Sequence, residues 1–168
     1  MPSEKRTYMK QRLELKVNGQ AYEVFVDPWQ SLADVLREEL GFTGVKVSCN
    51  SGNCGSCTVL LDGKAVKSCI MLAPLAEGKE ILTIEGLATE SGLHPLQEAF
   101  IEHFAVQCGY CTPGMILMAK ALLDENPNAT EDEIRVGLVG NLCRCTGYVK
   151  IVEAIMAARE KMKVTSSH

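Results

Sequence analysis

The first part of the chain carries the two-residue alternation of apolar and polar positions that is typical of half-buried strands. The alternating apolar residues are Leu13, Leu15 and Val17, then Tyr22, Val24 and Val26. Between them stands Asn18-Gly19, the dipeptide that favours a type I′ turn because both residues accept positive φ. The sequence therefore predicts a β-hairpin over residues 13–26.

A helical period follows the hairpin. Leu32, Val35, Leu36 and Leu40 share one face, with Ser31 as the expected N-cap and Gly41 as the residue just past the C-terminus. A loop rich in Gly and Ser then covers residues 44–57. The expected elements after it are Thr58–Leu61, an Asp62-Gly63 turn, Ala65–Cys69 and a strand over Glu80–Glu85. This order of hairpin, helix, loop, hairpin and strand predicts a β-grasp arrangement.

From His94 onward every periodic segment is helical. The four apolar stripes are Leu96, Ala99, Phe100 and Phe104; Met115, Leu117, Met118, Ala121 and Leu122; Ile134, Leu138 and Val139; and Ile151, Ile155 and Ala158. We expect His94 to cap the first helix at Pro95, Thr112 the second, and a Thr130–Glu133 capping box the third, with the fourth ending near Lys161.

The change from strand to helix patterns near residues 86–93 predicts an α+β protein of two domains. The first, residues 11–86, is expected to be a ferredoxin-like β-grasp domain. The second, residues 87–163, is expected to be an all-α four-helix bundle.

Composition excludes several classes of function. The 168 residues carry a net charge of −4 and no basic run, which argues against nucleic acid as a partner. The polar N-terminus MPSEKRTYMK lacks the apolar stretch of a signal peptide, and no run of about eighteen apolar residues could span a membrane. We expect a cytoplasmic protein, whose eight cysteines serve as ligands and not as disulfides.

The cysteines form two sets of four. The first quartet is Cys49, Cys54, Cys57 and Cys69, with the C-x4-C-x2-C spacing and distant fourth cysteine of plant-type [2Fe–2S] proteins. Gly52 and Gly55 permit the sharp bends and close approach that such a loop needs. Zinc is the competing interpretation, but structural zinc sites usually join two C-x2-4-C pairs, which this spacing does not.

The second quartet is Cys108, Cys111, Cys143 and Cys145. Its C-x2-C and C-x-C pairs are less diagnostic, and on ligand chemistry alone both iron–sulfur and zinc remain open. Both pairs precede predicted helices, whose N-termini favour anionic thiolates. Arg144, between two of these cysteines, is either a further counter-charge or a solvated surface residue.

No acid–base constellation accompanies the cysteines. His94, His103 and His168 do not pair with cysteines as a Rieske centre requires, and no Ser-His-Asp order, H-E-x-x-H motif or phosphate-binding glycine loop is present. We therefore predict no catalytic residue in this chain.

Three segments carry a family resemblance: Val47–Val59, Gln107–Met115 (QCGYCTPGM) and Gly140–Tyr148 (GNLCRCTGY). In this order they resemble the small iron–sulfur subunit of the xanthine oxidase, or molybdenum hydroxylase, family, including the small subunit of carbon monoxide dehydrogenases. The resemblance covers about residues 11–160 and implies a [2Fe–2S] cluster at the second quartet as well.

The resemblance also implies a function. Such a chain passes electrons from molybdopterin on a large subunit, through the second and then the first quartet, to FAD on a medium subunit, within a hetero-hexamer built as a dimer of heterotrimers. It implies that Gln107 and the sulfur of Cys145 meet the pterin. From the residues alone, Gln107 would instead satisfy backbone groups at a helix end.

This sequence departs from the family's pattern at Ser48, Asn53 and Ser56, where glycine, acidic and alanine residues are commoner. The new polar groups are expected to add hydrogen bonds near the first quartet. Two rival interpretations stay open: a free two-cluster ferredoxin that shuttles electrons between soluble partners, and a structural zinc module. The substrate of the complex is not encoded in this chain.

Overall fold

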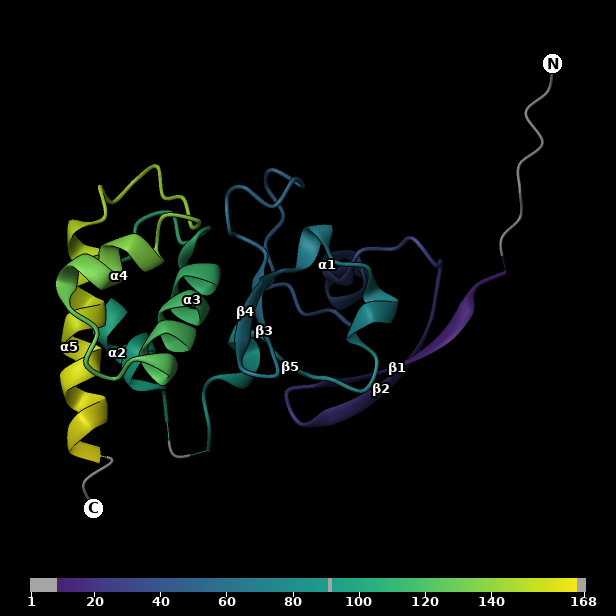
Figure 1. Cartoon of the computed structure of the whole chain (residues 1–168), viewed down its shortest axis with the longest axis horizontal. Helices are drawn as coiled ribbons and strands as arrows, with labels where there is room; N and C mark the ends of the chain where they lie inside the picture. Colours follow the sequence, from purple (N-terminus) through teal and green to yellow (C-terminus); the bar gives the residue numbers. More distant parts are fainter. Residues whose placement is uncertain (1–8, 91, 166–168) are drawn as a thin grey trace.

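The computed structural model describes residues 9–90 and 92–165. A five-stranded mixed sheet is built from β1 (Gln11–Val17), β2 (Gln20–Val26), β3 (Thr58–Leu61), β4 (Lys64–Lys67) and β5 (Glu80–Leu82). The strand order is β2-β1-β5-β3-β4, with β1 parallel to β5 and the other pairs antiparallel. Figure 1 shows this sheet, with the first helix, on one side of the molecule and the helices of the second half of the chain on the other.

Both predicted hairpins are confirmed. Asn18 and Gly19 have φ values of 52° and 79° between β1 and β2, and Asp62 and Gly63 have 49° and 80° between β3 and β4. Positive φ at both central positions is the property of the type I′ turn, whose twist suits paired strands. The β3–β4 turn therefore sends the chain back beside the residues that follow the cysteine loop.

The predicted first helix is present, but it is α-helical only in its first turn. Ser31 is the N-cap of α1 (Leu32–Asp34), and its hydroxyl accepts a hydrogen bond from the Asp34 amide. The helix continues as a π-helical turn over Val35–Glu39. The Leu40 amide donates to the Val35 carbonyl, five residues back, so the last turn is wider than an α-helix. Gly41 ends the segment with a φ of 77°, as expected.

Two of the predicted strands are longer than the observed ones. β4 ends at Lys67, and Ser68–Ile70 form a 3₁₀ turn, so Cys69 lies just beyond the strand and not within it. β5 ends at Leu82 because the Thr83 amide donates to the Asn18 side chain. Another 3₁₀ turn follows over Ile84–Gly86.

The second half of the described chain consists of α2 (Pro95–Glu102), α3 (Thr112–Glu125), α4 (Glu131–Gly137) and α5 (Val149–Thr165). α2 packs against α3 and α5, and α4 packs against the same two helices. α3 also contacts β3 and β4, which joins the helices to the sheet (Figure 1).

The predicted helix starts are confirmed with one small shift. His94 Nδ1 accepts the Leu96 amide while Gln97 accepts the His94 amide, and Thr130 and Glu133 form the expected reciprocal box. α3 is capped by Cys111, so Thr112 is its first helical residue and not its cap. Boundaries of this kind often differ by one residue.

Two positions assigned to buried helix faces are exposed. Phe104 is 81% and Val139 73% exposed, because α2 has ended at Glu102 and α4 at Gly137. Phe104 has a φ of 55°, which turns the chain out of the helical path. α5 runs past Lys161 to Thr165.

Each half has its own apolar core. One core lies between the sheet and α1 and includes Leu13, Leu15, Val17, Leu32, Leu36 and Ile81; the other lies among the helices and includes Leu96, Phe100, Met115, Ile134, Ile151 and Ile155. The expected mixture of a sheet and helices is confirmed, whereas the domain limits stay a prediction. Among residues 9–90 and 92–165, no helix has the length and apolar character needed to cross a membrane.

Candidate metal centres

The first quartet lies on the loop before β3 and on the turn after β4. Cys57 and Cys69 are buried, and Cys49 and Cys54 are half-buried. Gly52 and Gly55 have φ values of 77° and 73°, as their use in a tight loop requires. A Cβ on Gly55 would lie 2.4 Å from the Gly140 carbonyl oxygen, so this glycine also permits contact with the loop of the second quartet.

Hydrogen-bond donors surround the sulfurs of the first quartet. The amides of Ser51 and Cys54 both donate to Cys49 Sγ at 3.4 Å. Hydrogen bonds from the Ser51 side chain and these amides lower the pKa of Cys49 to about 5, which favours the thiolate that binds metal. The Ser56 hydroxyl lies 3.4 Å from Cys54 Sγ, so one of the unusual polar residues contacts a cysteine, as predicted.

The thiols of this quartet act on one another's pKa values. Cys54 helps to lower the pKa of Cys49, and Cys57 helps to raise that of Cys69. Burial, and then the hydrogen bond with Cys57, raise the pKa of Cys69 to about 11. A cation or metal close to this buried pair would favour the thiolate form.

The second quartet brings together cysteines from two segments of the chain. Cys145 Sγ lies 3.5 Å from Cys108 Sγ, and Cys143 acts on the pKa of Cys111. Cys108 and Cys145 are exposed, whereas Cys111 and Cys143 are half-buried. Burial, followed by the bond with Cys143, raises the pKa of Cys111 to about 12.

Cys143 has the most donors of the second quartet. The Thr146 hydroxyl and amide donate to Cys143 Sγ at 3.1 and 3.4 Å. Burial acts to raise the pKa of Cys143, but these bonds outweigh it and the pKa is lowered. The Cys143 amide donates to the Tyr148 hydroxyl at 2.8 Å, which fixes the loop.

The donor chemistry of the quartets bears on the kind of metal site that they suit. Each quartet offers four thiols, and four cysteines are the donor set of a two-iron centre, in which each iron takes two protein ligands. The residues present therefore fit a [2Fe–2S] cluster in each quartet.

The two quartet loops touch each other directly. The Leu142 amide, next to Cys143, donates to the Cys54 carbonyl at 2.8 Å. The Tyr110 hydroxyl, from between Cys108 and Cys111, donates to the Val47 carbonyl at 2.8 Å. A backbone hydrogen bond and the Tyr110 side chain therefore both link the two sites.

Asn141 forms a buried polar junction between the same loops. Its side-chain nitrogen donates to the carbonyls of Gly55 and Gly114 at 3.1 and 3.0 Å, and its oxygen accepts from Lys67 Nζ at 2.7 Å. Asn141 is 2% exposed, so these bonds satisfy an amide that water does not reach. Sequence reasoning missed Lys67 and Asn141, because only the fold brings them together.

Gln107, which the resemblance places at the pterin, is exposed. Arg144 is also exposed. His94 caps α2, as expected, and His168 lies outside the described residues.

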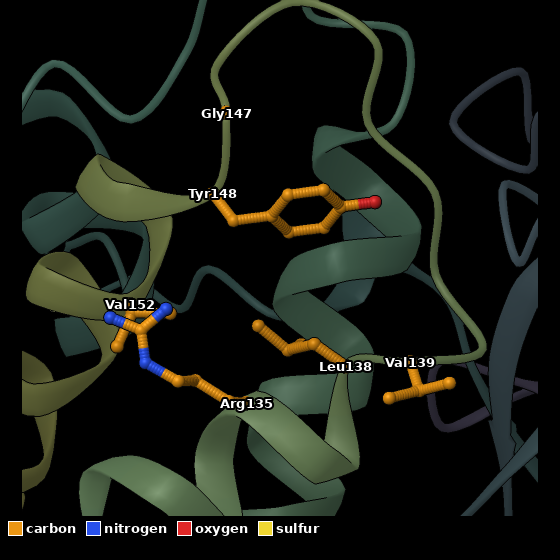
Figure 2. Close-up of a pocket in the computed structure, with 6 residues that line it drawn as sticks. All are labelled: Arg135, Leu138, Val139, Gly147, Tyr148 and Val152. Atoms are coloured by element: carbon orange, nitrogen blue, oxygen red, sulfur yellow. The ribbon is translucent and has the colours of Figure 1, made fainter.

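A cavity of about 300 Å³ lies beside the second quartet's loop (Figure 2). Its lining is mainly apolar, with one guanidinium, and consists of Arg135, Leu138, Val139, Gly147, Tyr148 and Val152. No cysteine is among these residues, so the cavity adjoins the candidate centre without being part of it.

Two family models match adjoining parts of the chain. The model described as "2Fe-2S iron-sulfur cluster binding domain" matches residues 15–87, and that described as "[2Fe-2S] binding domain" matches residues 83–156.

Similar proteins of named function match nearly the whole chain. The "nicotinate dehydrogenase small FeS subunit" of Eubacterium barkeri is 51% identical over 149 residues, which are 89% of this chain and 95% of that subunit. The "aldehyde oxidoreductase" of Megalodesulfovibrio gigas is 47% identical over 86% of this chain but only 16% of its own length. A crystal structure of quinoline 2-oxidoreductase from Pseudomonas putida 86 superposes with a TM-score of 0.89 at 45% identity, covering 94% of this chain and 98% of that one.

Proposed function

The chain belongs to the small iron–sulfur subunits of the molybdenum hydroxylases, and from this premise we propose how it carries electrons between two partner subunits. The supporting observation is the contact between the two cysteine quartets, in which the Leu142 amide bonds to the Cys54 carbonyl. Two two-iron donor sets joined in this way suit a relay within one chain.

We assign one [2Fe–2S] cluster to each quartet. Cys49 and Cys54 would bind one iron of the first cluster and Cys57 and Cys69 the other, since Cys54 acts on the pKa of Cys49 and Cys57 on that of Cys69. In the second cluster the pairs would be Cys108 with Cys145 and Cys111 with Cys143. Such clusters supply one-electron redox chemistry, and the chain's amides and hydroxyls set their potentials through hydrogen bonds to sulfur.

The fold suits this division. We propose that residues 11–86, with their β2-β1-β5-β3-β4 sheet and single helix, form a ferredoxin-like β-grasp domain. Residues 87–163 would form the four-helix domain around the second core.

The second quartet is the side that we assign to the molybdenum partner. Cys108 and Cys145 are exposed, and Phe104, Val106, Tyr110, Leu142 and Val149 near them in the chain are exposed by 40–81%. Large apolar side chains gathered around an uncovered site are typical of a surface that a partner covers. Gln107 and Cys145, both exposed, are then the residues that would meet molybdopterin.

The same order of electron transfer assigns a second partner to the first quartet. The first quartet would deliver electrons to FAD on a medium subunit, and the complete assembly would be a cytoplasmic hetero-hexamer, a dimer of heterotrimers. The substrate is bound by the large subunit and is not determined by any residue of this chain.

The decisive experiment is to purify the chain at native expression and measure its metals and co-eluting polypeptides. About four iron atoms per chain, together with molybdenum and two larger chains, would support the proposal. The same iron without molybdenum or partners would identify a free two-cluster ferredoxin instead. Zinc in place of iron would overturn the redox function.

The role of Gln107 has its own test. Gln107→Ala should leave both iron–sulfur signals unchanged and slow substrate-driven reduction of the clusters, because the amide acts toward the partner. Loss of the second cluster's signal in this variant would make Gln107 structural and contradict the assignment.

A further inference from the structure

A single lysine lies beside the first quartet. Lys67 is directly opposite Thr58 in the β3–β4 pairing, and Thr58 follows Cys57 in the chain. Lys67 is also two residues before Cys69. The backbone of Lys67 therefore lies next to the residues that adjoin Cys57 and Cys69, on a strand whose position is fixed by main-chain pairing.

The ammonium group is held there by two buried acceptors. Lys67 Nζ lies 3.1 Å from Thr58 Oγ1 and 2.7 Å from Asn141 Oδ1, and these two residues are 1% and 2% exposed. Thr58 Oγ1 in turn donates to the Gly55 carbonyl at 2.7 Å. The charge is thus tethered to the Cys54–Cys57 segment itself and not left to solvent.

The orientation of Asn141 is determined by its surroundings. An ammonium group can only donate, so the amide oxygen must face Lys67, and the amide nitrogen must face the carbonyls of Gly55 and Gly114. Since Asn141 precedes Cys143 by two residues, the loop of the second quartet positions a charge at the first.

No acidic side chain contacts this ammonium group among the interactions of the described residues. The thiols of Cys57, Cys54, Cys69 and Cys49 act on Lys67 as opposing charges. Burial lowers the pKa of Lys67, and these four sulfurs act to raise it. A half-buried positive charge is screened less by salt than an exposed one, so it acts strongly on nearby charge.

We propose that Lys67, held by Asn141, raises the reduction potential of the first-quartet cluster. This inference rests on the proposed function. One-electron reduction adds one negative charge to that cluster, with the electron supplied by substrate oxidation in the complex or by dithionite in a titration. A fixed ammonium nearby stabilises the reduced form by Coulomb attraction and favours electron arrival at the first quartet.

The test is a redox titration of the purified complex, with the two clusters followed separately by their electron paramagnetic resonance signals. Lys67→Gln removes the charge but keeps a hydrogen-bond donor, and it should shift the first cluster's midpoint to a more negative potential. The second cluster's midpoint should shift less. Lys67→Arg keeps the charge and should restore the potential toward that of the wild type.

A matched control lies on the same strand. Lys64 is exposed at the start of β4, and Lys64→Gln changes the net charge of the chain equally. It should leave both midpoints near their wild-type values. An equal shift in Lys64→Gln and Lys67→Gln, or no shift in Lys67→Gln, would overturn the proposal.

The remaining outcomes are also decisive. If Lys67→Gln loses iron from the first quartet while Lys67→Arg keeps both iron and potential, a charge requirement is supported. If both variants lose that iron, Lys67 is structural and the proposal fails. Absence of two iron–sulfur signals in the wild-type complex would instead contradict the proposed function itself.

Discussion

The two cysteine quartets differ in how much of their surroundings this chain supplies. In the first quartet Cys57 and Cys69 are 1% and 8% exposed, the Ser56 hydroxyl lies 3.4 Å from Cys54 Sγ, and Lys67 adds a charge on which all four thiols act. In the second quartet Cys108 and Cys145 are exposed. The chain therefore encloses more of the first site than of the second, which agrees with our proposal that a partner covers the second.

The largest expected effect comes from two variants, each of which removes one cysteine ligand from one of the quartets. Cys145→Ser should abolish the second cluster and leave the first, because no neighbouring thiol can replace a ligand paired with Cys108. The iron content should fall from about four to about two atoms per chain, and the electron paramagnetic resonance signal of the second cluster should disappear. Substrate should then no longer reduce the first cluster.

The matched variant at the first quartet is Cys69→Ser. It should abolish the first signal and also lower the thermal midpoint, because Cys69 belongs to the core of its half. Normal substrate reduction of the first cluster in Cys145→Ser would show that the order of the two sites is wrong.

The next effect concerns the contact between the quartet loops. Gly55→Ala would place a Cβ 2.4 Å from the Gly140 carbonyl oxygen, whereas Gly63→Ala, at a similar positive φ, meets no atom within 4 Å. Overpacking of this kind lowers the free energy of unfolding by about 1–3 kcal/mol. In Gly55→Ala this loss adds to the cost of placing alanine at a positive φ, which both variants share. Denaturant unfolding of both variants measures the difference, and equal losses would argue against a tight fit between the loops.

A smaller and more selective effect is expected from the hydroxyls near sulfur. Ser56→Ala should make the first cluster's midpoint more negative, because a donor near Cys54 is lost. Thr146→Val should do the same at the second cluster by removing the donor to Cys143. Redox titration of both variants tests this, and a shift in the cluster farther from the substitution would contradict it.

The smallest effect is a pH dependence confined to the helical half. Burial lowers the pKa of His94, with Lys120 acting the same way and Asp124 opposing. At a pH between the lowered pKa of His94 and the ordinary histidine pKa of about 6.5, the unfolded chain binds more protons than the folded chain. The free energy of unfolding therefore falls as the pH drops through that window, and it is unaffected by His94 above the ordinary pKa. Protonation would also remove the Nδ1 acceptor of the Leu96 amide.

His94→Asn keeps a capping oxygen that does not titrate. Thermal midpoints measured from about pH 7 to about pH 5 should therefore decline less in the variant than in the wild type. Identical slopes would show that other groups govern acid stability.

Local features of the fold were predictable because the signals are local. Asn18-Gly19, Ser31, His94 and the Thr130–Glu133 box each act within a few residues, and each has the expected role. Phe104 and Val139 were placed wrongly because helical periodicity does not tell where a helix ends.

The site was predictable in its cysteines and not in its surroundings. Their spacing allowed both quartets to be proposed, and their pairing in space fits that proposal. Lys67 and Asn141 are 74 residues apart, and nothing in either local pattern indicates that they meet. Gly55 was interpreted as a bend near sulfur, whereas it also makes room for Asn141.

The close contact at Gly55 and Gly114 also limits how the two halves of the chain could be exchanged by recombination. A Cβ on Gly114 would lie 2.4 Å from the Gly55 carbonyl oxygen, so each half is shaped to the other's backbone. Recombination that exchanged one half alone would have to preserve this fit, which favours transmission of both halves together. The Megalodesulfovibrio gigas relative matches 86% of this chain within a far longer polypeptide. In that relative, a stretch similar to both halves of this chain lies within one polypeptide.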